Sequence, residues 1–428
     1  YHFYHVEDVI QIDGKKLYTR QGTGVPVRLI LISGRKEKQE GAAPVYKKER
    51  DTIVRTFQEL YDRVTALMDE KEFEQPKEEQ KMIDINELER EAKALERLFD
   101  GDELGSPYIP SSNACVVLNT QVPDSMSFET QAALNRIKQD VGGNMDNFVR
   151  HRLGYGTHGD LCNALSAEQI DAVAMAIYNI EARGQGMIIG DQTGIGKGRI
   201  AAAMIRYGVR QGLKPIFITE KASLFSSIYR DLSAIGSAHL KPFIINGREA
   251  KSDIKDEEGN IIYQALGPTE QGTIFESRTV PPPYDFVVGT YSQFNSPEKK
   301  PEKPSYLMAI ANGNLLIMDE SHNSSGSSNT GEFMQRVVRD TRGVVFLSAT
   351  FAKRPDNMPI YAMKTSISEA NMTRDELVDA IMKGGVALQE VLSSQLVAEG
   401  QMIRRERSFE GVEVNYISLD QYEDKHRK

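Results

Sequence analysis

One stretch decides the fold, and it reads Met187-Ile188-Ile189-Gly190-Asp191-Gln192-Thr193-Gly194-Ile195-Gly196-Lys197-Gly198-Arg199. Its apolar start predicts a short buried strand, and the alanine-rich residues after it predict a helix. The glycines between them let backbone N–H groups converge on phosphate oxygens, and the helix start adds a partial positive charge. Lys197 would then reach the β and γ phosphates as a point charge. The stretch predicts a nucleotide-phosphate loop, with a glycine-rich turn that serves packing alone as the alternative.

Two positions depart from the usual pattern of such loops. Asp191 stands where many nucleotide-binding loops carry Gly or Ala, and Gly198 stands where a Ser or Thr hydroxyl normally touches Mg²⁺. The prediction of nucleotide binding therefore depends on whether partner motifs follow at suitable spacing.

Length and composition set the outer bounds. The 428 residues suffice for two or three domains, and the net charge of −9 still leaves room for a local basic groove. The two cysteines, Cys115 and Cys162, lie far apart, which favours free buried thiols in a reducing cytosol over a disulfide or a zinc site. No apolar run approaches the roughly 20 residues that span a bilayer, so we expect no membrane partner. The chain begins at Tyr1 without Met, which indicates a fragment of a longer polypeptide.

Strand and helix patterns alternate from residue 187 to residue 350, which is typical of an α/β fold with a doubly wound parallel sheet. We expect strands at 214–219, 243–245, 285–289, 315–318 and 344–347. Ligands in such sheets bind beyond the carboxyl ends of the strands. Residues at those ends suit a groove that follows a nucleic-acid backbone, and the candidates are Lys221, Thr290, Tyr291 and Gln293.

A pair of acids follows the apolar strand that begins at Leu315. Asp319 could hold Mg²⁺, and Glu320 could polarise the attacking water. Burying both without a metal would be costly, although solvated acids at a strand end are the alternative. His322 completes an Asp-Glu-x-His arrangement, which typically links a nucleotide site to a nucleic-acid site; a plain histidine is the alternative.

Two further elements fit a nucleotide site. Ser348 and Thr350 end the next strand, where their hydroxyls can bond the acidic motif and relay the nucleotide state. Gln169 lies on a helix that Ser166 caps and that leads to the phosphate loop. Its amide could read both edges of adenine.

The chain divides into four parts by pattern. Residues 1–36 look like strands, 37–105 like a helical linker or hairpin, 106–355 like the nucleotide-binding lobe and 356–428 like a helical extension. In the extension we expect helices over 366–383 and 387–399. Three arginines follow, which serve either a solvated strand edge or phosphate contact: Arg404, Arg405 and Arg407.

Together, the phosphate loop, the Asp-Glu-Ser-His motif and the Ser-Ala-Thr motif resemble the first RecA-like lobe of a superfamily 2 helicase. The stretch 165–173 and the loop resemble the strawberry notch family, in which glycine after the loop lysine is the norm. The segments 384–390 and 404–413 are similar to that family as well, and the resemblance covers roughly residues 106–416. The motif at 319–326 looks closer to the phage and plasmid branch, and 14–26 resemble the closing strands of DNA adenine methyltransferase domains.

The resemblance implies ATP and Mg²⁺ as cofactors and a larger multi-domain phage or mobile-element protein, some relatives of which act against host restriction. It implies that Gln169 reads adenine and Asp319 holds Mg²⁺. Glu320, Lys197 and His322 would be catalytic, and Ser348 and Thr350 would couple hydrolysis to movement. The phosphates would be wrapped by Thr193, Gly194, Ile195, Gly196, Lys197, Gly198 and Arg199.

Nucleic acid is the implied partner, with DNA favoured over RNA because of the methyltransferase-like start, and the implied location is the bacterial host cytoplasm or the virion. A second RecA-like lobe with arginine fingers is expected, but no such motifs precede Lys428. Because an arginine finger is worth roughly three to five orders of magnitude in turnover, we expect residues 1–428 alone to bind ATP weakly and hydrolyse it poorly. A nucleotide-binding structural component is the alternative, and a P-loop kinase leaves the Ser-Ala-Thr motif without a role.

Overall fold

The computed structural model describes residues 4–12, 27–35, 53, 54, 59, 63, 105–114, 116–295, 301–324, 329–349, 357–369, 376 and 392–407. At the centre of this described part is a seven-stranded sheet in the order β13-β5-β12-β11-β6-β10-β7, in which all neighbouring strands are parallel. The strands are β5 (Met187–Ile189), β6 (Ile216–Thr219), β7 (Pro242–Ile244), β10 (Phe286–Thr290), β11 (Leu315–Asp319), β12 (Gly343–Leu347) and β13 (Met402–Ile403). The predicted doubly wound parallel sheet is therefore confirmed.

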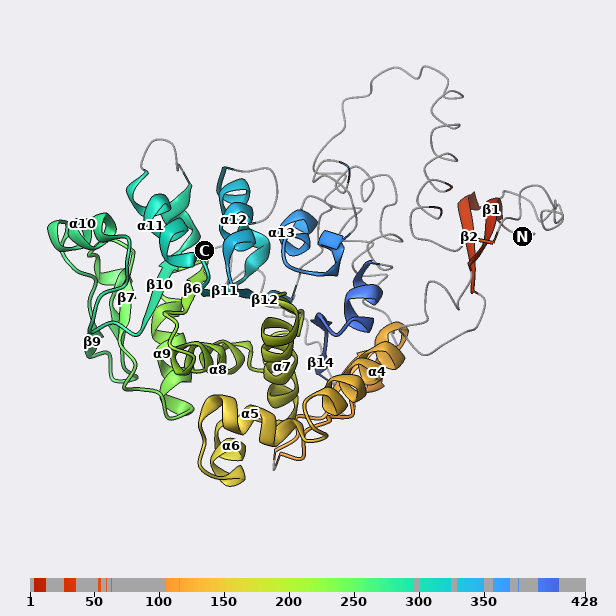
Figure 1. The fold of residues 1–428 in the computed structure, drawn as a ribbon, viewed down its shortest axis with the longest axis horizontal. Helices are drawn as coiled ribbons and strands as arrows, with labels where there is room; N and C mark the ends of the chain where they lie inside the picture. The colour runs from red at the N-terminus through yellow and green to blue at the C-terminus, as the bar shows by residue number, and fades with distance from the viewer. Residues whose placement is uncertain are drawn as a thin grey trace, which may run out of the picture.

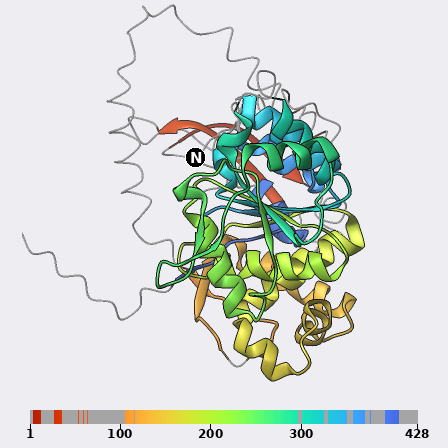
Figure 2. The ribbon, with the colours of Figure 1, turned by 90° about the vertical axis from the view of Figure 1, so that its left-hand side faces the viewer.

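Helices cover both faces of this sheet, as Figures 1 and 2 show. One layer contains α7 (Ala167–Tyr178), α8 (Lys197–Arg210) and α9 (Leu224–Ala234). The other contains α11 (Glu302–Ala311), α12 (Asn329–Asp340) and α13 (Met358–Ala362). Because the strands are buried on both faces, their sequences are continuous apolar runs rather than alternating ones.

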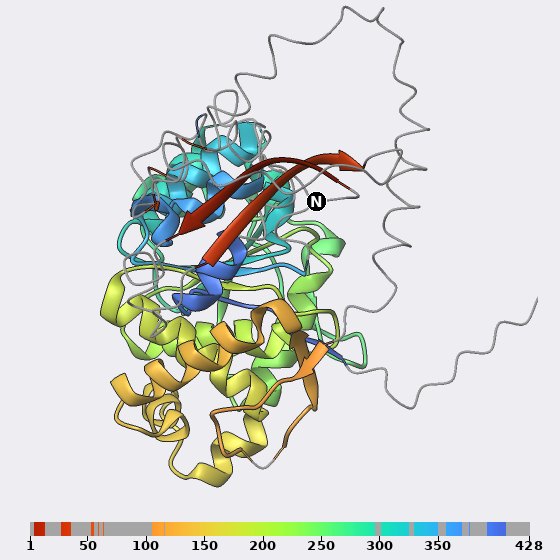
Figure 3. The same cartoon turned by 90° about the vertical axis from the view of Figure 1, so that its right-hand side faces the viewer.

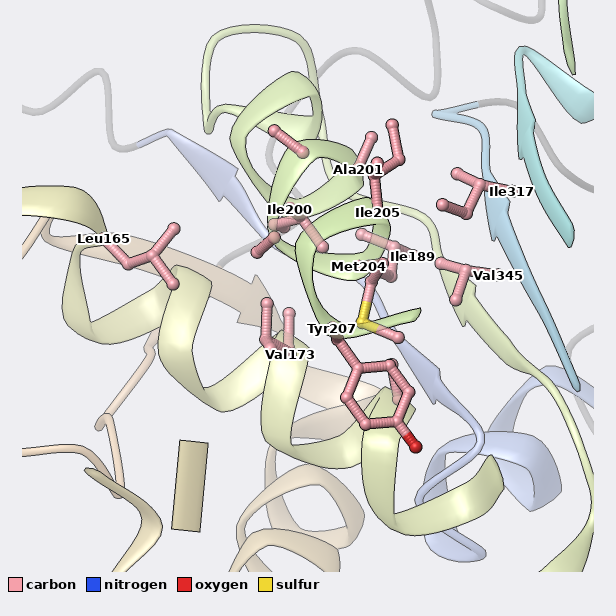
Figure 4. Packing of buried hydrophobic residues seen from close by; sticks show 14 of the residues in the cluster. Leu165, Val173, Ile189, Ile200, Ala201, Met204, Ile205, Tyr207, Ile317 and Val345 are labelled. Carbon is pink, nitrogen blue, oxygen red and sulfur yellow. The ribbon is translucent and has the colours of Figure 1, made fainter. Parts of the chain in front are cut away.

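The two apolar cores follow the period-two alternation of each strand. Ile189, Ile317 and Val345 belong to the core on the α7–α9 side, and their neighbours Ile188, Leu316 and Val344 belong to the core on the opposite side. Figure 4 shows the first core at close range, with Met204 and Ile205 of α8 beside these strand residues. The sheet is thereby held between the two helical layers, and the loops at the carboxyl ends of its strands meet at one edge.

Further elements surround this core. The helices among them are α4 (Asp124–Asp140), α5 (Met145–Leu153), α6 (His158–Ala164) and α10 (Pro268–Ser277), with a π turn η2 at Asn179–Arg183 after α7. Short helical turns occur at η3 (Ala250–Ser252), η4 (Tyr291–Phe294), η5 (Ser321–Ser324) and η7 (Ser366–Glu369). A small sheet joins β14 (Glu406–Arg407), β4 (Thr120–Pro123) and β3 (Gly105–Pro107), and β8 (Ile254–Lys255) pairs with β9 (Ile261–Tyr263). In the described residues no helix has both the length and the apolar character needed to span a bilayer.

The N-terminal strands pair with each other. β1 (Tyr4–Ile12) runs antiparallel to β2 (Val27–Arg35), and Figure 3 shows them as a long ribbon pair. We expected 25–32 to form a buried strand, but in β2 Ile30 is 43% exposed and its neighbours Leu29 and Leu31 are only half-buried, so this part of the expectation is wrong. The methyltransferase-like stretch 14–26 and most of the expected linker 37–105 lie outside the described residues.

The C-terminal segment differs from expectation. Residues 402–403, which we assigned to a helical extension, add the edge strand β13 beside β5. Met402 and Ile403 are fully buried there, and the burial of these apolar side chains stabilises the pairing of the segment with the sheet. Of the two expected helices, the described residues show a short turn at 366–369 and a helix over 392–398; the rest of 366–399 falls largely outside them.

Candidate nucleotide site

The phosphate loop connects β5 to α8, which begins at Lys197. Gly194 and Gly196 have φ angles of 92° and 93°, in the left-handed region that glycine adopts without a steric penalty. A Cβ at Gly196 would also clash with the side-chain amide of Gln169. Thr193 and Gly194 are exposed, whereas Ile195 is buried and anchors the loop in the core. The loop therefore has the backbone form that a phosphate cradle requires.

Lys197 and the acidic motif share one site. The ammonium of Lys197 donates to the backbone oxygen of Asp191 at 2.6 Å, so the side chain folds back over the loop. The loop follows β5 and Asp319 ends β11, and both strands pair in parallel with β12, so Lys197 and Asp319 lie at the same edge of the sheet. The charge of Lys197 also acts to lower the pKa of Asp319. The structure thus brings together the two elements that the nucleotide hypothesis needs at one edge of the sheet.

Asp319 ends strand β11 in a polar setting. The Thr219 hydroxyl donates to Oδ2 of Asp319 at 2.8 Å, and the Tyr291 hydroxyl donates to its backbone oxygen at 2.7 Å. Burial raises the pKa of the Asp319 carboxyl, the bond from Thr219 opposes this, and the neighbouring charge of Glu320 raises it further. Asp319 is thus a carboxylate whose negative charge is incompletely compensated by the protein.

Glu320 and His322 extend the acidic motif toward the next strand. Glu320 has a φ of 46°, a conformation that is uncommon for a residue with a side chain and that often marks functional sites. Nδ1 of His322 lies 3.4 Å from Oε2 of Glu320 and 2.9 Å from the Ser348 hydroxyl. Glu320, His322 and Ser348 therefore form a connected polar chain, whereas Thr350 lies outside the described residues.

Gln169 connects the helix α7 to the phosphate loop. Its Oε1 accepts from the backbone N–H of Ser166 at 3.0 Å, which completes the capping box at the start of α7. Its Nε2 donates to the backbone oxygen of Ile195 at 3.0 Å, and the residue is 8% exposed. The structure shows Gln169 supporting the loop; its contact with adenine stays a prediction.

Asp191 forms a buried ion pair that the sequence reasoning missed. Both Asp191 and Arg405 are fully buried, with Nη2 to Oδ2 at 2.6 Å and Nε to Oδ1 at 3.1 Å. Nη1 of Arg405 also donates to the backbone oxygen of Glu168 at 2.5 Å, and its guanidinium lies over the Tyr108 ring. The solvated-edge interpretation of Arg405 is therefore wrong. An acid in the loop together with a distant arginine run was the available signal, because a buried acid needs a cation.

The glycine after the loop lysine also has a steric cause. A Cβ at Gly198 would clash with Oδ2 of Asp231 on α9, so this carboxylate takes the space of a Ser or Thr side chain. Nε of Arg199 lies 3.5 Å from Asp231, and Nη1 of Arg199 donates to the backbone oxygen of Ala164. Arg199 therefore links α8 to α9 and to the end of α6 through these contacts, and its predicted contact with phosphate stays a prediction.

The four nucleic-acid candidates divide into two pairs. Thr290 and Tyr291 are only 2% and 5% exposed, and their hydroxyls are bonded within the protein. Lys221 is exposed beside Glu220, and Gln293 is half-buried and accepts a bond from Lys303 at 2.5 Å. An open pocket of about 520 Å³ lies at these strand ends, and its lining includes Lys221, Asn246, Lys251, Thr290, Gln293 and Lys303.

The donor set fits a magnesium nucleotide. The loop supplies glycine backbone and Lys197, and the undercompensated Asp319 carboxylate would gain from a nearby divalent cation. The described residues contain no cluster of three His, Cys, Asp or Glu side chains that could hold a metal unaided. That fits Mg²⁺, which typically uses one or two carboxylates together with substrate phosphates and water.

Comparisons with known proteins show what the chain is similar to. The chain is 27% identical to human strawberry notch homolog 2 over 263 residues, which is 58% of this chain and 18% of that protein. It is 26% identical to Drosophila melanogaster strawberry notch over 273 residues, or 15% of that protein. The chain thus spans less than a fifth of the length of these curated relatives.

Among solved structures, the Sulfolobus solfataricus SWI2/SNF2 ATPase core in complex with dsDNA matches with a TM-score of 0.40 and 16% identity, over 57% of this chain and 45% of that chain. A family model described as P-loop containing NTP hydrolase pore-1 matches residues 156–428. The phosphate loop, the acidic motif and the sheet that carries both lie in that match, and the chain belongs to this family of P-loop containing NTP hydrolases.

Proposed function

We propose that the chain is the ATP-binding and ATP-hydrolysing lobe of a helicase-like motor that moves on nucleic acid, with DNA as the track. The observation that carries the proposal is the set of groups at one sheet edge. The loop with Lys197 and the strand that ends at Asp319 lie on either side of β12 at one sheet edge, and Glu320 is connected through His322 to Ser348. A lysine for the phosphates, an acid for Mg²⁺ and a second acid that can orient water are three of the parts that P-loop hydrolysis uses.

Each residue has a distinct task in this proposal. The backbone N–H groups of the loop and the ammonium of Lys197 bind the phosphates, and Gln169 reads adenine. Asp319 would hold Mg²⁺, which when bound neutralises part of the phosphate charge. Glu320 accepts a hydrogen bond from the attacking water and orients it toward the phosphate, and His322 restrains the Glu320 carboxylate from one side.

The pocket at the strand ends is the proposed nucleic-acid contact. Its lysines, Lys221, Lys251 and Lys303, suit phosphate contact, and Gln293 and the backbone near Thr290 lie beside them. Tyr291 follows directly after Thr290 and donates to the backbone of Asp319. A shift of η4 on nucleic-acid binding would therefore reach the acidic motif through one hydrogen bond, which supports coupling between track and hydrolysis.

The motor would be completed by further parts of a longer protein. A second RecA-like lobe would supply the arginine fingers, so residues 1–428 alone would turn ATP over slowly. The methyltransferase partner, the phage or plasmid context and a role against restriction are predictions from the sequence resemblance of 14–26 and 319–326, and they follow only if the longer protein contains those parts.

ATP hydrolysis measured with and without DNA tests the function. We expect the full-length protein to hydrolyse ATP faster with duplex DNA, and we expect Lys197→Ala and Glu320→Gln to abolish this activity. Arg339→Ala is the matched control, because Arg339 is an exposed residue of α12 whose ion pair, among the described residues, is with Asp340 beside it. Hydrolysis that is indifferent to any DNA or RNA would instead support the nucleotide-binding structural component, as in a virion or a complex.

A further inference from the structure

Arg407 lies on the phosphate loop although it is 213 residues away from it in the sequence. Its Nη2 donates to the backbone oxygen of Gly194 at 2.6 Å. A Cβ at Gly194 would lie 3.1 Å from Nε of Arg407 and 3.4 Å from its Cζ. Glycine at this position thus suits the positive φ and leaves room for the guanidinium directly over the backbone.

The backbone that carries Arg407 is fixed to the loop at several points. The N–H of Gln192 donates to the backbone oxygen of Arg405 at 2.8 Å, and Oε1 of Gln192 accepts from the N–H of Arg407 at 3.2 Å. Strand β14 also pairs with β4, where Arg407 lies opposite Thr120. The backbone of Arg407 is therefore held beside the loop, and the buried ion pair of Arg405 and Asp191 stabilises this arrangement.

Arg407 is paired differently from the two arginines before it. Arg404 pairs with Glu406 at 2.9 Å, and Arg405 pairs with Asp191. Arg407 is exposed, its side chain donates to a neutral carbonyl, and no ion pair joins it to a carboxylate within the described ranges. Asp191 is the one acid within residues 190–199, and Arg405 neutralises it. The other acids beside the loop, Asp231 and Asp319, come from α9 and β11 and lie next to Gly198 and Lys197 rather than Arg407.

We propose that Arg407 is a further polyphosphate-binding residue of the nucleotide site. On binding of a nucleoside triphosphate its guanidinium exchanges the carbonyl of Gly194 for a phosphate oxygen. The exchange is favourable because a hydrogen bond between two charged groups is roughly twice as strong as one to a neutral acceptor, and the guanidinium fork matches phosphate geometry. The inference rests on the proposed nucleotide binding, and Arg405 acts in it as a positioning residue.

Equilibrium binding of ATP and ADP in the presence of Mg²⁺ tests the proposal on the full 428-residue chain. We expect Arg407→Ala to weaken ATP binding by about tenfold to a hundredfold, the range for a hydrogen bond to a charged group. ADP carries less charge and should lose less, so the preference for ATP over ADP falls. Arg404→Ala removes the same charge from the same segment and should change both affinities by less than about threefold.

Two further variants separate phosphate binding from support of the loop. Arg407→Gln keeps a donor for the Gly194 carbonyl but removes the charge, so it should lose as much ATP affinity as Arg407→Ala, whereas Arg407→Lys should regain part of it. Wild-type ATP affinity in Arg407→Gln, alongside lost affinity in Lys197→Ala, overturns the inference and leaves the proposed function standing. Wild-type affinity in Lys197→Ala overturns the proposed function itself.

Discussion

Replacement of Asp191 by alanine, the residue that many nucleotide loops carry there, should destabilise this protein. Asp191 and Arg405 are both completely buried, and the arginine makes two side-chain bonds to the carboxylate. Removal of one partner of a buried ion pair leaves an uncompensated charge, which costs about 3–5 kcal/mol. We expect Asp191→Ala to fall near the lower end, because the Glu168 backbone oxygen and the Tyr108 ring still contact the guanidinium.

A double variant separates the loss of one partner from the loss of the whole pair. In Asp191→Ala with Arg405→Met both charges are absent and the methionine fills most of the arginine's space. Such a replacement of a buried pair is often neutral or stabilising by about 1–4 kcal/mol. We therefore expect the double variant to be at least as stable as Arg405→Met alone, with a coupling energy of about 3 kcal/mol between the two positions.

Urea denaturation without nucleotide, followed by circular dichroism, measures these free energies of unfolding. The control is Glu249→Ala, which breaks the exposed pair with Lys251 and should cost no more than about 1 kcal/mol. Single variants at Asp191 and Arg405 that each cost less than about 1 kcal/mol, with no coupling between them, would refute the account of this pair.

Three other predictions follow from the site and its supports. Gly198→Ser should destabilise the fold by about 1–3 kcal/mol because the new side chain meets the Asp231 carboxylate. Adding Asp231→Ala should recover most of this lost free energy of unfolding, measured by urea denaturation. An equal loss in the single and the double variant would contradict the prediction. Burial raises the pKa of Asp171 from its ordinary 3.8 to about 6, so the folded state holds the proton more tightly. Its stabilising effect is complete only well below the ordinary pKa of 3.8 and is lost as the pH rises through about 6. The stability of the wild type relative to Asp171→Asn should therefore fall by about 2 kcal/mol between pH 4 and 7; a difference that is independent of pH would contradict this. Tyr291→Phe removes the bond to the Asp319 backbone and should reduce DNA stimulation of hydrolysis while ATP affinity stays within about twofold; unchanged stimulation would exclude that route of coupling.

The central sheet could be predicted because local patterns determine it. The apolar runs before Gly190 and Asp319 are too short and too continuous for surface helices, and each ends in a loop that must reverse the chain. The proximity of His322 and Ser348 followed from the adjacent parallel strands that carry them. Order and spacing along the sequence were sufficient for these features.

Other contacts could not be predicted because they depend on packing between distant segments. Arg405 lies 214 residues from Asp191, and nothing local in either segment specifies the other as its partner. The same holds for Asp231, which reaches Gly198 only because α8 and α9 pack side by side. Tyr291 was proposed for nucleic acid from its place after a strand, yet that place alone could not show that its hydroxyl faces the acidic motif.

The most direct test of the account is an experimental structure of the chain with Mg²⁺ and a non-hydrolysable ATP analogue. The account predicts that the β and γ phosphates lie between the ammonium of Lys197 and the carboxylates of Asp319 and Glu320. It would be contradicted if the analogue bound elsewhere on the protein, or if its phosphates lay beyond the reach of either Lys197 or Asp319.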